Sequence, residues 1–229
     1  MKSKIINRKP IDTTNTIVVQ DVQVDPQNIE MHRQRINTIF AGKSEDYRLE
    51  QINKMIMHDI LFSQAMNHLF KHYEFEIDPS EQEKFAELVI SEWKKRSNQQ
   101  TKTNSSKQHD DQNSTTNEQE FVIDEQSKEL AKMAASKLII QNLILEDIQQ
   151  QNNITVDDKE LEKILLDYYQ NTNQPIRSFK QNPENYENAR KSIIHEKTIN
   201  YILSMFKFDL DKFNKELEEF VKKNNLQPK

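Results

Sequence analysis

Histidine side chains are the first residues in this sequence whose type and spacing suggest chemistry. His68 and His72 stand four residues apart, which places both imidazoles on one face of a helix, where they can bind a metal ion. No carboxylate or third histidine lies at a companion spacing, so a solvated helix face is the favoured interpretation. His32 and His195 are isolated, and no serine–histidine–aspartate arrangement is supported. We therefore expect no metal, no cofactor and no enzymatic activity.

Two pairs of carboxylates come next, because paired acids can perform acid–base catalysis. Glu81 with Glu83, and Glu160 with Glu162, both fall in the first turn of an expected helix. Negative charge is stabilising at that end of a helix, where the dipole is positive. Helix capping explains these four residues without a catalytic role.

Asp59 is a less ordinary carboxylate, because a helical wheel places it inside an apolar face, between Met66 and Ile52. A buried carboxylate needs a partner. Arg33 or Arg35, on the preceding helix, can supply one. We therefore expect a structural ion pair there, in preference to a functional site.

The composition narrows the classes of fold and function. The chain has one glycine in 229 residues. That is too few for the tight turns of a β-rich fold, and it cannot form a glycine-rich phosphate loop. No cysteine is present, which excludes disulfides and thiolate sites. The net charge is −5, and acidic and basic residues are evenly mixed along the chain. This charge distribution indicates neither a nucleic-acid nor a membrane partner. With no apolar stretch typical of a signal peptide or membrane span, we expect a cytoplasmic location.

Capping residues and an apolar period of 3.6 residues predict an all-α protein. The first helix is expected to begin at Asp25–Pro26 and to stop near Gly42, since these residue types favour the two ends of a helix. Further helices are expected at about 44–73, from 78 through 93, at about 124–151, from 157, as a short turn after 175, and from 182.

Composition also divides the chain into blocks. Residues 97–120 contain no apolar side chain, and such a segment cannot bury enough surface to fold. Ile17–Val24 could be extended, but a single strand has no evident partner. The expected organisation is a flexible N-terminal arm (1–24), a first helical arm (25–96), a disordered insertion (97–122), a second helical arm and base (123–208) and a C-terminal amphipathic helix (209–229).

An internal repeat relates the two halves. The turn Phe75–Asp78 matches Ile154–Asp157, and the two capping aspartates stand 79 residues apart. Each turn follows a long helix and precedes a returning one, which is the pattern of an αα-hairpin used twice. Two such arms favour a clamp over an enzyme with a pocket.

Three segments of the second half carry a family resemblance: Leu143–Ile148, Asn153–Leu161 and Ile199–Leu203. In this pattern the region 139–208 resembles the C-terminal substrate-binding domain of trigger factor and the related SurA-type chaperones. In the first half, Ile29–Ile36 and Leu61–Asn67 resemble a small mollicute protein family with a helical fold of the same type. Together the resemblance covers about residues 25–208.

The resemblance implies an elongated all-α fold with two helical-hairpin arms and no β core. It also implies ATP-independent, chaperone-like binding of non-native polypeptides, the activity of a holdase. Nothing here matches the ribosome-binding or prolyl-isomerase domain of trigger factor, so neither activity is expected. The alternative is a helical adaptor that binds one specific folded partner. The expected oligomeric state is a monomer or a weak dimer.

Apolar side chains are distributed unequally between the two halves. Phe62, Phe70 and Tyr73 correspond, in the repeat, to two glutamines and an asparagine. Met55 and Met66 lie on the same side of that helix, and methionine adapts to varied partners. These five residues are the candidate polypeptide-binding surface; the alternative is that the N-terminal helix packs against them.

Overall fold

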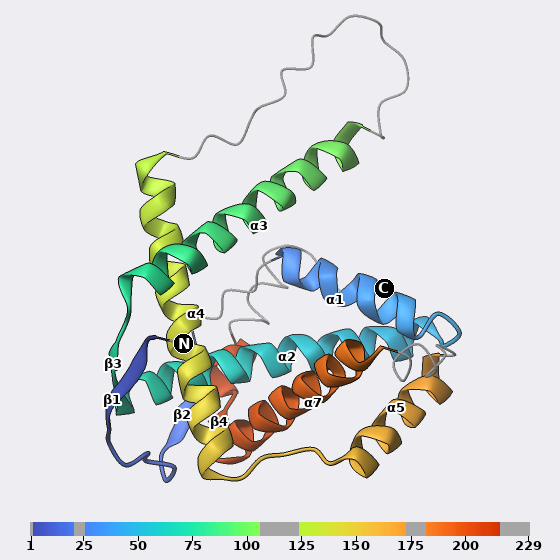
Figure 1. Cartoon of the computed structure of the whole chain (residues 1–229). Coiled ribbons are helices and arrows are strands. Elements are labelled where there is room, and N and C mark those ends of the chain that lie inside the picture. Colours follow the sequence, from blue (N-terminus) through green and yellow to red (C-terminus); the bar gives the residue numbers. More distant parts are fainter. Residues whose placement is uncertain (1, 21–25, 106–123, 173–181, 216–229) are drawn as a thin grey trace, which may run out of the picture. The chain divides into compact units, whose positions relative to one another are not determined.

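The computed structural model describes residues 2–20, 26–105, 124–172 and 182–215 (Figure 1). Helices make up most of this part of the chain and the strands in it are short, which confirms the predicted fold class. No helix in these ranges is long and apolar enough to cross a membrane. The expected helical turn after Pro175 and most of the expected disordered insertion lie outside the described residues.

The helices begin close to the predicted capping residues. Ser44 caps α2 with its side chain, and Asn182 caps α7, which has proline at its first position. Helix α4 ends where Asn153 adopts a left-handed conformation with φ of 50°. The helices are α1 Pro26–Ile39, α2 Glu45–Leu69, α3 Pro79–Ser105, α4 Glu125–Gln151, α5 Asp158–Thr172 and α7 Pro183–Ser204, with a 3₁₀ turn η1 at Phe70–His72.

Four short strands form two separate two-stranded sheets in the described residues. Strand β1 (Lys4–Arg8) pairs antiparallel with β3 (Tyr73–Glu76), with an irregularity in register between Ile5 and Asn7. Strand β2 (Thr16–Val18) pairs parallel with β4 (Lys207–Asp209). No partner for Ile17 was expected from the sequence, because its partner, Phe208, lies nearly 200 residues away along the chain.

The chain divides into two compact units, each made from two separate stretches. The first unit comprises Met1–Arg8 and Tyr73–Ile144, and the second comprises Lys9–His72 and Leu145–Lys229. Helix α4 therefore contributes residues to both units.

In the first unit, hydrogen bonds join the residues just before β1 to the start of α3. Asp78 caps α3 by accepting a hydrogen bond from the Glu81 backbone N–H at 3.0 Å, as predicted. The Glu81 carboxylate does not reach back to the Asp78 N–H; it accepts from the backbone N–H groups of Ser3 (2.8 Å) and Lys2 (3.1 Å). The Ser3 hydroxyl accepts the Asp78 N–H instead, at 3.0 Å. Hydrogen bonds from Ser3 hold the pKa of the Glu81 carboxyl below its usual range.

Helix α3 packs against α4, and the two form what we call the α3–α4 pair. Its buried core consists of Ala86, Ala131 and Ala135. Half-buried Phe85, Val89, Ile90 and Trp93 pack against these alanines. Polar contacts add to the pair: Gln82 donates to Ser136 at 2.7 Å, and Lys132 lies 3.4 Å from Glu83.

In the second unit, α1 and α7 lie alongside α2 (Figure 1). Helix α2 buries residues at a helical spacing, which explains the predicted amphipathic pattern. A second contact, the α5–α7 pair, has a core of Val156, Leu161 and Leu165 packed against residues of α7. The α2 residues that are buried are Ile52, Ile60, Ala65, Met66 and Leu69.

The turn before α5 is held in place by α7. Asp157 caps α5 by accepting the Glu160 N–H at 2.8 Å, as predicted. The Glu160 carboxylate binds the Lys197 ammonium at 2.9 Å, which also donates to the Thr155 carbonyl. Arg190 donates to the Val156 carbonyl at 2.6 Å. Two cations of α7 therefore fasten this turn.

The structure differs from the sequence-based organisation in two respects. The helix that packs against α3 is α4 and the helix that packs against α5 is α7, whereas the repeat predicted hairpins formed across the two turns. Helical periodicity identifies the face that is buried, but it does not identify the helix that covers it. In addition, α3 continues to Ser105 through residues expected to be disordered, because each added residue of a formed helix gains one hydrogen bond.

Candidate polypeptide-binding surfaces

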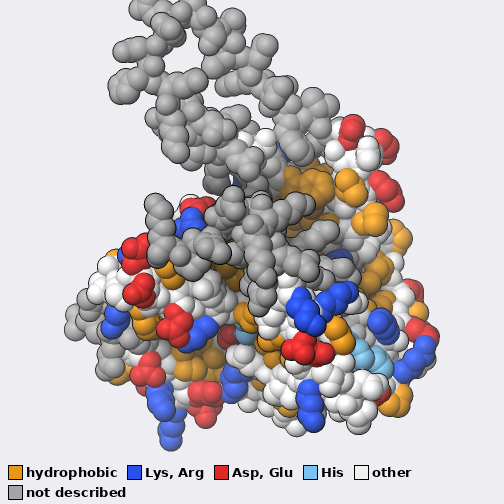
Figure 2. Space-filling view, turned by 180° about the vertical axis from the view of Figure 1, so that it is seen from behind, with side chains coloured by type: hydrophobic (Ala, Val, Ile, Leu, Met, Phe, Trp, Pro, Cys, Tyr) orange, Lys and Arg blue, Asp and Glu red, His pale blue; other side chains and the backbone are white. Residues whose placement is uncertain are grey.

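Large apolar side chains lie exposed on the α3–α4 pair of the first unit. Leu88 of α3 is 62% exposed, and on α4 Met133 is 63%, Leu130 is 51% and Leu138 is 42% exposed. Leu130 and Met133 are three residues apart and so lie on one face of α4. Figure 2 shows hydrophobic side chains gathered over this part of the molecule. We call these four residues, which lie on two helices and on more than one helix face, the arm surface.

The small core of the pair explains why these side chains are exposed. Alanine lets two helices approach closely but offers little surface to bury. The large side chains of the pair must therefore lie beside the alanine contact or outside it. Phe85 and Trp93 lie beside it and are only half-buried. The result is apolar surface that a monomeric protein does not need for its own core.

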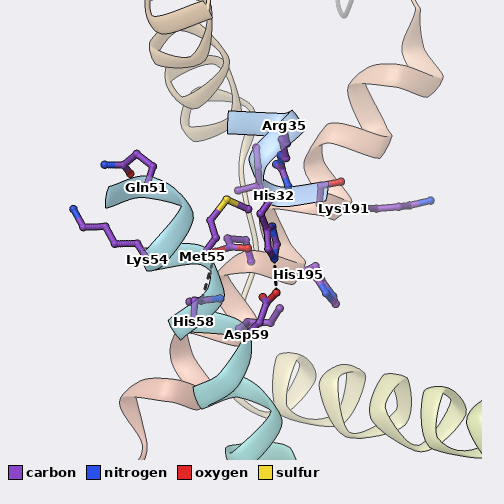
Figure 3. Close-up of a pocket in the computed structure, with 13 residues that line it drawn as sticks. His32, Arg35, Gln51, Lys54, Met55, His58, Asp59, Lys191 and His195 are labelled. Carbon is purple, nitrogen blue, oxygen red and sulfur yellow. Dashed lines mark hydrogen bonds and ion pairs between the residues drawn. The ribbon is translucent and has the colours of Figure 1, made fainter. Parts of the chain in front are cut away.

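A groove in the second unit is the other candidate. Its volume is about 1030 Å³, and its walls come from α1, α2 and α7 (Figure 3). Half-buried Met55 and Ile193 supply apolar surface, Ile199 beneath them is buried, and the remaining lining residues are polar or charged. Those residues are His32, Arg35, Gln51, Lys54, His58, Asp59, Lys191, Ser192, His195 and Glu196.

Two histidines of the groove engage its two carboxylates. His32 Nε2 lies 2.7 Å from Asp59 Oδ2, and this contact joins α1 to α2. His58 Nε2 lies 3.8 Å from Glu196 Oε1 and 3.1 Å from the Asn200 side-chain oxygen, which joins α2 to α7. The imidazoles therefore link the three walls of the groove, while both carboxylates remain more than half exposed.

The cations of the groove are less engaged. Lys54 pairs with Glu50 at 2.6 Å on the exposed face of α2. Within the described residues, Arg35 and Lys191 have no hydrogen bond or ion pair. In Figure 3, Lys54 and Lys191 extend on opposite sides of the groove. Arg35 and Lys191 therefore give its rim positive charge that no carboxylate of the described chain neutralises.

The five residues expected to bind polypeptide do not form one exposed surface. Met66 and Tyr73 are 3% and 6% exposed, so neither side chain is available to a partner. Tyr73 belongs to the first unit, where its ring stacks on Phe75 with centroids 5.9 Å apart. Phe62 and Phe70 are half-buried in the second unit. Met55 lines the groove and remains a candidate.

The expected ion pair of Asp59 differs in partner and in burial. Asp59 does reach α1, but it pairs with His32 and not with Arg33 or Arg35. Arg33 pairs with Glu30 of its own helix at 3.4 Å. The Asp59 side chain is 56% exposed, so the prediction of a buried carboxylate was wrong. Asp59 lines the groove and is open to solvent there, which a helical wheel does not show.

The histidine pair, His68 of α2 and His72 of η1, contacts the backbone of an N-terminal segment. His68 Nε2 lies 3.2 Å from the Asp12 carbonyl oxygen, and His72 Nδ1 lies 2.8 Å from that of Pro10. Their rings are 5.1 Å apart. No group of three or more histidine, aspartate or glutamate side chains in the described chain could hold a metal ion.

Sequence reasoning missed the arm surface. The signal was present: Leu130 and Met133 fall away from the face that carries Ala131 and Ala135. Alanine attracts little attention in a count of apolar residues, yet its spacing marks the contact between the helices. Leu130 and Met133, which lie off that face, are left exposed, whereas the exposure of Leu138, seven residues after Ala131, does not follow from this spacing.

Comparison with known proteins shows the family of the chain. The family model of the bacterial trigger factor protein C-terminus matches residues 44–204. The uncharacterized protein MG377 of Mycoplasma genitalium is 26% identical over 208 residues, which cover 91% of this chain and 93% of that protein. Its homolog in Mycoplasma pneumoniae is 26% identical over 200 residues, covering 87% of this chain and 89% of that one.

A solved structure agrees on the fold. The crystal structure of a hypothetical Mycoplasma protein, MPN555, matches with a TM-score of 0.68 and 23% identity, and covers 91% of each chain. The predicted resemblance to trigger factor is thus confirmed over more than half of the sequence, and it is a resemblance to a chaperone-like family. The chain belongs to the bacterial trigger factor C-terminus family.

Proposed function

We propose that this protein is an ATP-independent holdase of the cytoplasm that binds unfolded or nascent polypeptides. The observation that carries the proposal is the arm surface, four large apolar side chains that the α3–α4 pair leaves between 42% and 63% exposed. Membership of the trigger factor C-terminus family supports it. The proposal includes neither prolyl isomerisation nor docking to the ribosome.

The energetics of the arm surface suit a reversible binder. Apolar burial contributes roughly 25 cal/mol for each Å² removed from water, so a few leucine-sized contacts give a modest affinity. Ordering an unfolded client opposes binding and lowers that affinity further. Release therefore follows from weak binding at each contact and needs no nucleotide. Met133 adds a flexible side chain that fits clients of varied shape.

The test removes the arm surface and leaves the fold intact. The variant Leu130→Ser/Met133→Ser replaces two exposed side chains of α4, and the control Leu166→Ser replaces a 50% exposed leucine of α5 in the second unit. The measurement is light scattering from two unrelated, chemically unfolded clients as they aggregate. Circular dichroism melting verifies that all variants remain folded.

We expect the wild type and the Leu166→Ser control to slow the aggregation of both clients, and the α4 variant to lose most of that effect. A folded α4 variant that protects both clients as well as the wild type would refute the arm surface as the binding site. A wild type that protects neither client would refute the holdase and favour the alternative, a helical adaptor for one folded partner.

A further inference from the structure

We propose that the groove between α1, α2 and α7 binds acidic segments of client polypeptides, with an apolar side chain seated on Met55 and Ile193. The inference rests on the proposed function and adds a preference for one class of client segment. The arm surface selects by apolarity alone, whereas the groove combines apolar surface with charge. The occupant is thus a short peptide in which acidic and apolar residues alternate.

Charge complementarity is the first argument. The groove is lined by three permanent cations, Arg35, Lys54 and Lys191, against two carboxylates, Asp59 and Glu196. Lys54 is already paired with Glu50, so the positive charge available to a partner is that of Arg35 and Lys191, on a protein whose net charge is −5. An acidic client segment is attracted to these two cations.

The state of the carboxylates is the second argument. Asp59 accepts a hydrogen bond from His32, and Glu196 lies beside His58. Both acids are therefore already engaged by side chains of the groove itself. Arg35 and Lys191, which have no partner within the described residues, are free to bind a carboxylate that arrives from outside. Arginine is suited to this role because its guanidinium can hold both oxygens of one carboxylate.

The apolar surface of the groove is the third argument. Met55 projects into the groove between the walls (Figure 3), and Ile193 and Ile199 line it from α7. Cations at the rim with apolar side chains between them match a segment that carries both features. A free anion without an apolar group would use only the rim.

The experiment measures peptide affinity by fluorescence anisotropy at low and at moderate salt. The probes are three labelled peptides of equal length in which leucine alternates with glutamate, glutamine or lysine. The charge variant Arg35→Glu/Lys191→Glu reverses the rim. The control Lys84→Glu/Lys137→Glu makes the same change in net charge on exposed lysines of the first unit. A further variant, Met55→Ser, removes apolar surface from the groove.

We expect the wild type to bind the glutamate peptide most tightly, and the charge variant to weaken that binding by about tenfold at low salt and less at moderate salt. The control should bind as the wild type does within about twofold. Met55→Ser should weaken the glutamate and glutamine peptides by a similar factor. Glutamine or lysine peptides that bind as tightly as the glutamate peptide would overturn the inference, as would a charge variant indistinguishable from the control.

The failure of this inference is separable from failure of the holdase proposal. A wild type that suppresses client aggregation but has no preference for the glutamate peptide overturns the acidic groove alone. A wild type that binds the glutamate peptide but protects no client overturns the holdase and leaves a groove specific for acidic peptides, which is the adaptor alternative.

Discussion

The two helix pairs of this protein use opposite kinds of core. The α3–α4 pair buries three alanines, with Phe85 and Trp93 only half-buried beside them. The α5–α7 pair buries Val156, Leu161 and Leu165. In the second pair the large apolar side chains are the core, whereas in the first they lie around a core of small ones. A helix contact made by alanines can therefore leave leucines of the same helices exposed, where a partner can bind them.

The largest expected effect concerns the core of the α5–α7 pair. Leu161 is fully buried, so Leu161→Ala leaves a cavity and should lower the free energy of unfolding by about 2–5 kcal/mol. Denaturant unfolding followed by circular dichroism measures the loss. A loss below about 1 kcal/mol would mean that the pair does not depend on its leucine core, and the contrast between the two pairs would disappear.

The matching change in the α3–α4 pair adds volume instead of removing it. Ala135 is fully buried, so Ala135→Leu forces the helices apart and should cost about 1–3 kcal/mol. Met133→Ala, at an exposed position two residues away, is the control and should change stability by less than about 0.5 kcal/mol. If Ala135→Leu were neutral, the alanines would not set the spacing of the helices.

Removing the capping aspartate should lower stability by a similar amount at both turns, although the surrounding contacts differ. Asp78→Ala and Asp157→Ala each remove one hydrogen bond to a helix N-terminus, and each should cost about 0.5–2 kcal/mol. Asparagine at either position keeps an accepting oxygen and should restore most of the loss. Thermal melting of the four variants tests this, and a large cost at only one turn would show that its remote contacts, not its cap, hold it.

The smallest expected effect is an acid dependence at the start of α3 in the first unit. The pKa of Glu81 lies below its ordinary value of 4.5, so its contribution to stability is fully present above that value and is lost as pH falls through the folded pKa. Glu81→Gln lacks this titration. We expect the melting temperatures of Glu81→Gln and the wild type to converge below pH 4.5, and a difference that stays constant with pH would contradict the assignment.

Local signals in the sequence predicted where α3 and α5 begin. Asp78 and Asp157 cap the helices they were expected to cap, because a cap joins residues three positions apart. The roles of Glu81 and Glu160 were not predicted correctly, because their partners are not local. Glu81 binds Ser3 and Glu160 binds Lys197, and both partners are remote in sequence and invisible to a short motif.

The candidate sites were harder to predict than the fold. Met66 and Phe62 are apolar whether they face a client or their own core, and only the arrangement of helices decides between the two. The arm surface was missed because exposure depends on which helix covers α4. Asp59 was placed near α1 correctly, but a wheel cannot show that His32 is the nearer partner or that water reaches the carboxylate.

The parallel pairing of β2 with β4 has a consequence for the order of events during synthesis. Thr16 of β2 pairs with Lys207 of β4, so about 190 residues must be made before this contact can close. Strand β1, by contrast, meets β3 as soon as the chain has passed Glu76. Lys4–Arg8 can therefore pair early in synthesis, whereas Thr16–Val18 cannot pair with β4 until Asp209 has been made.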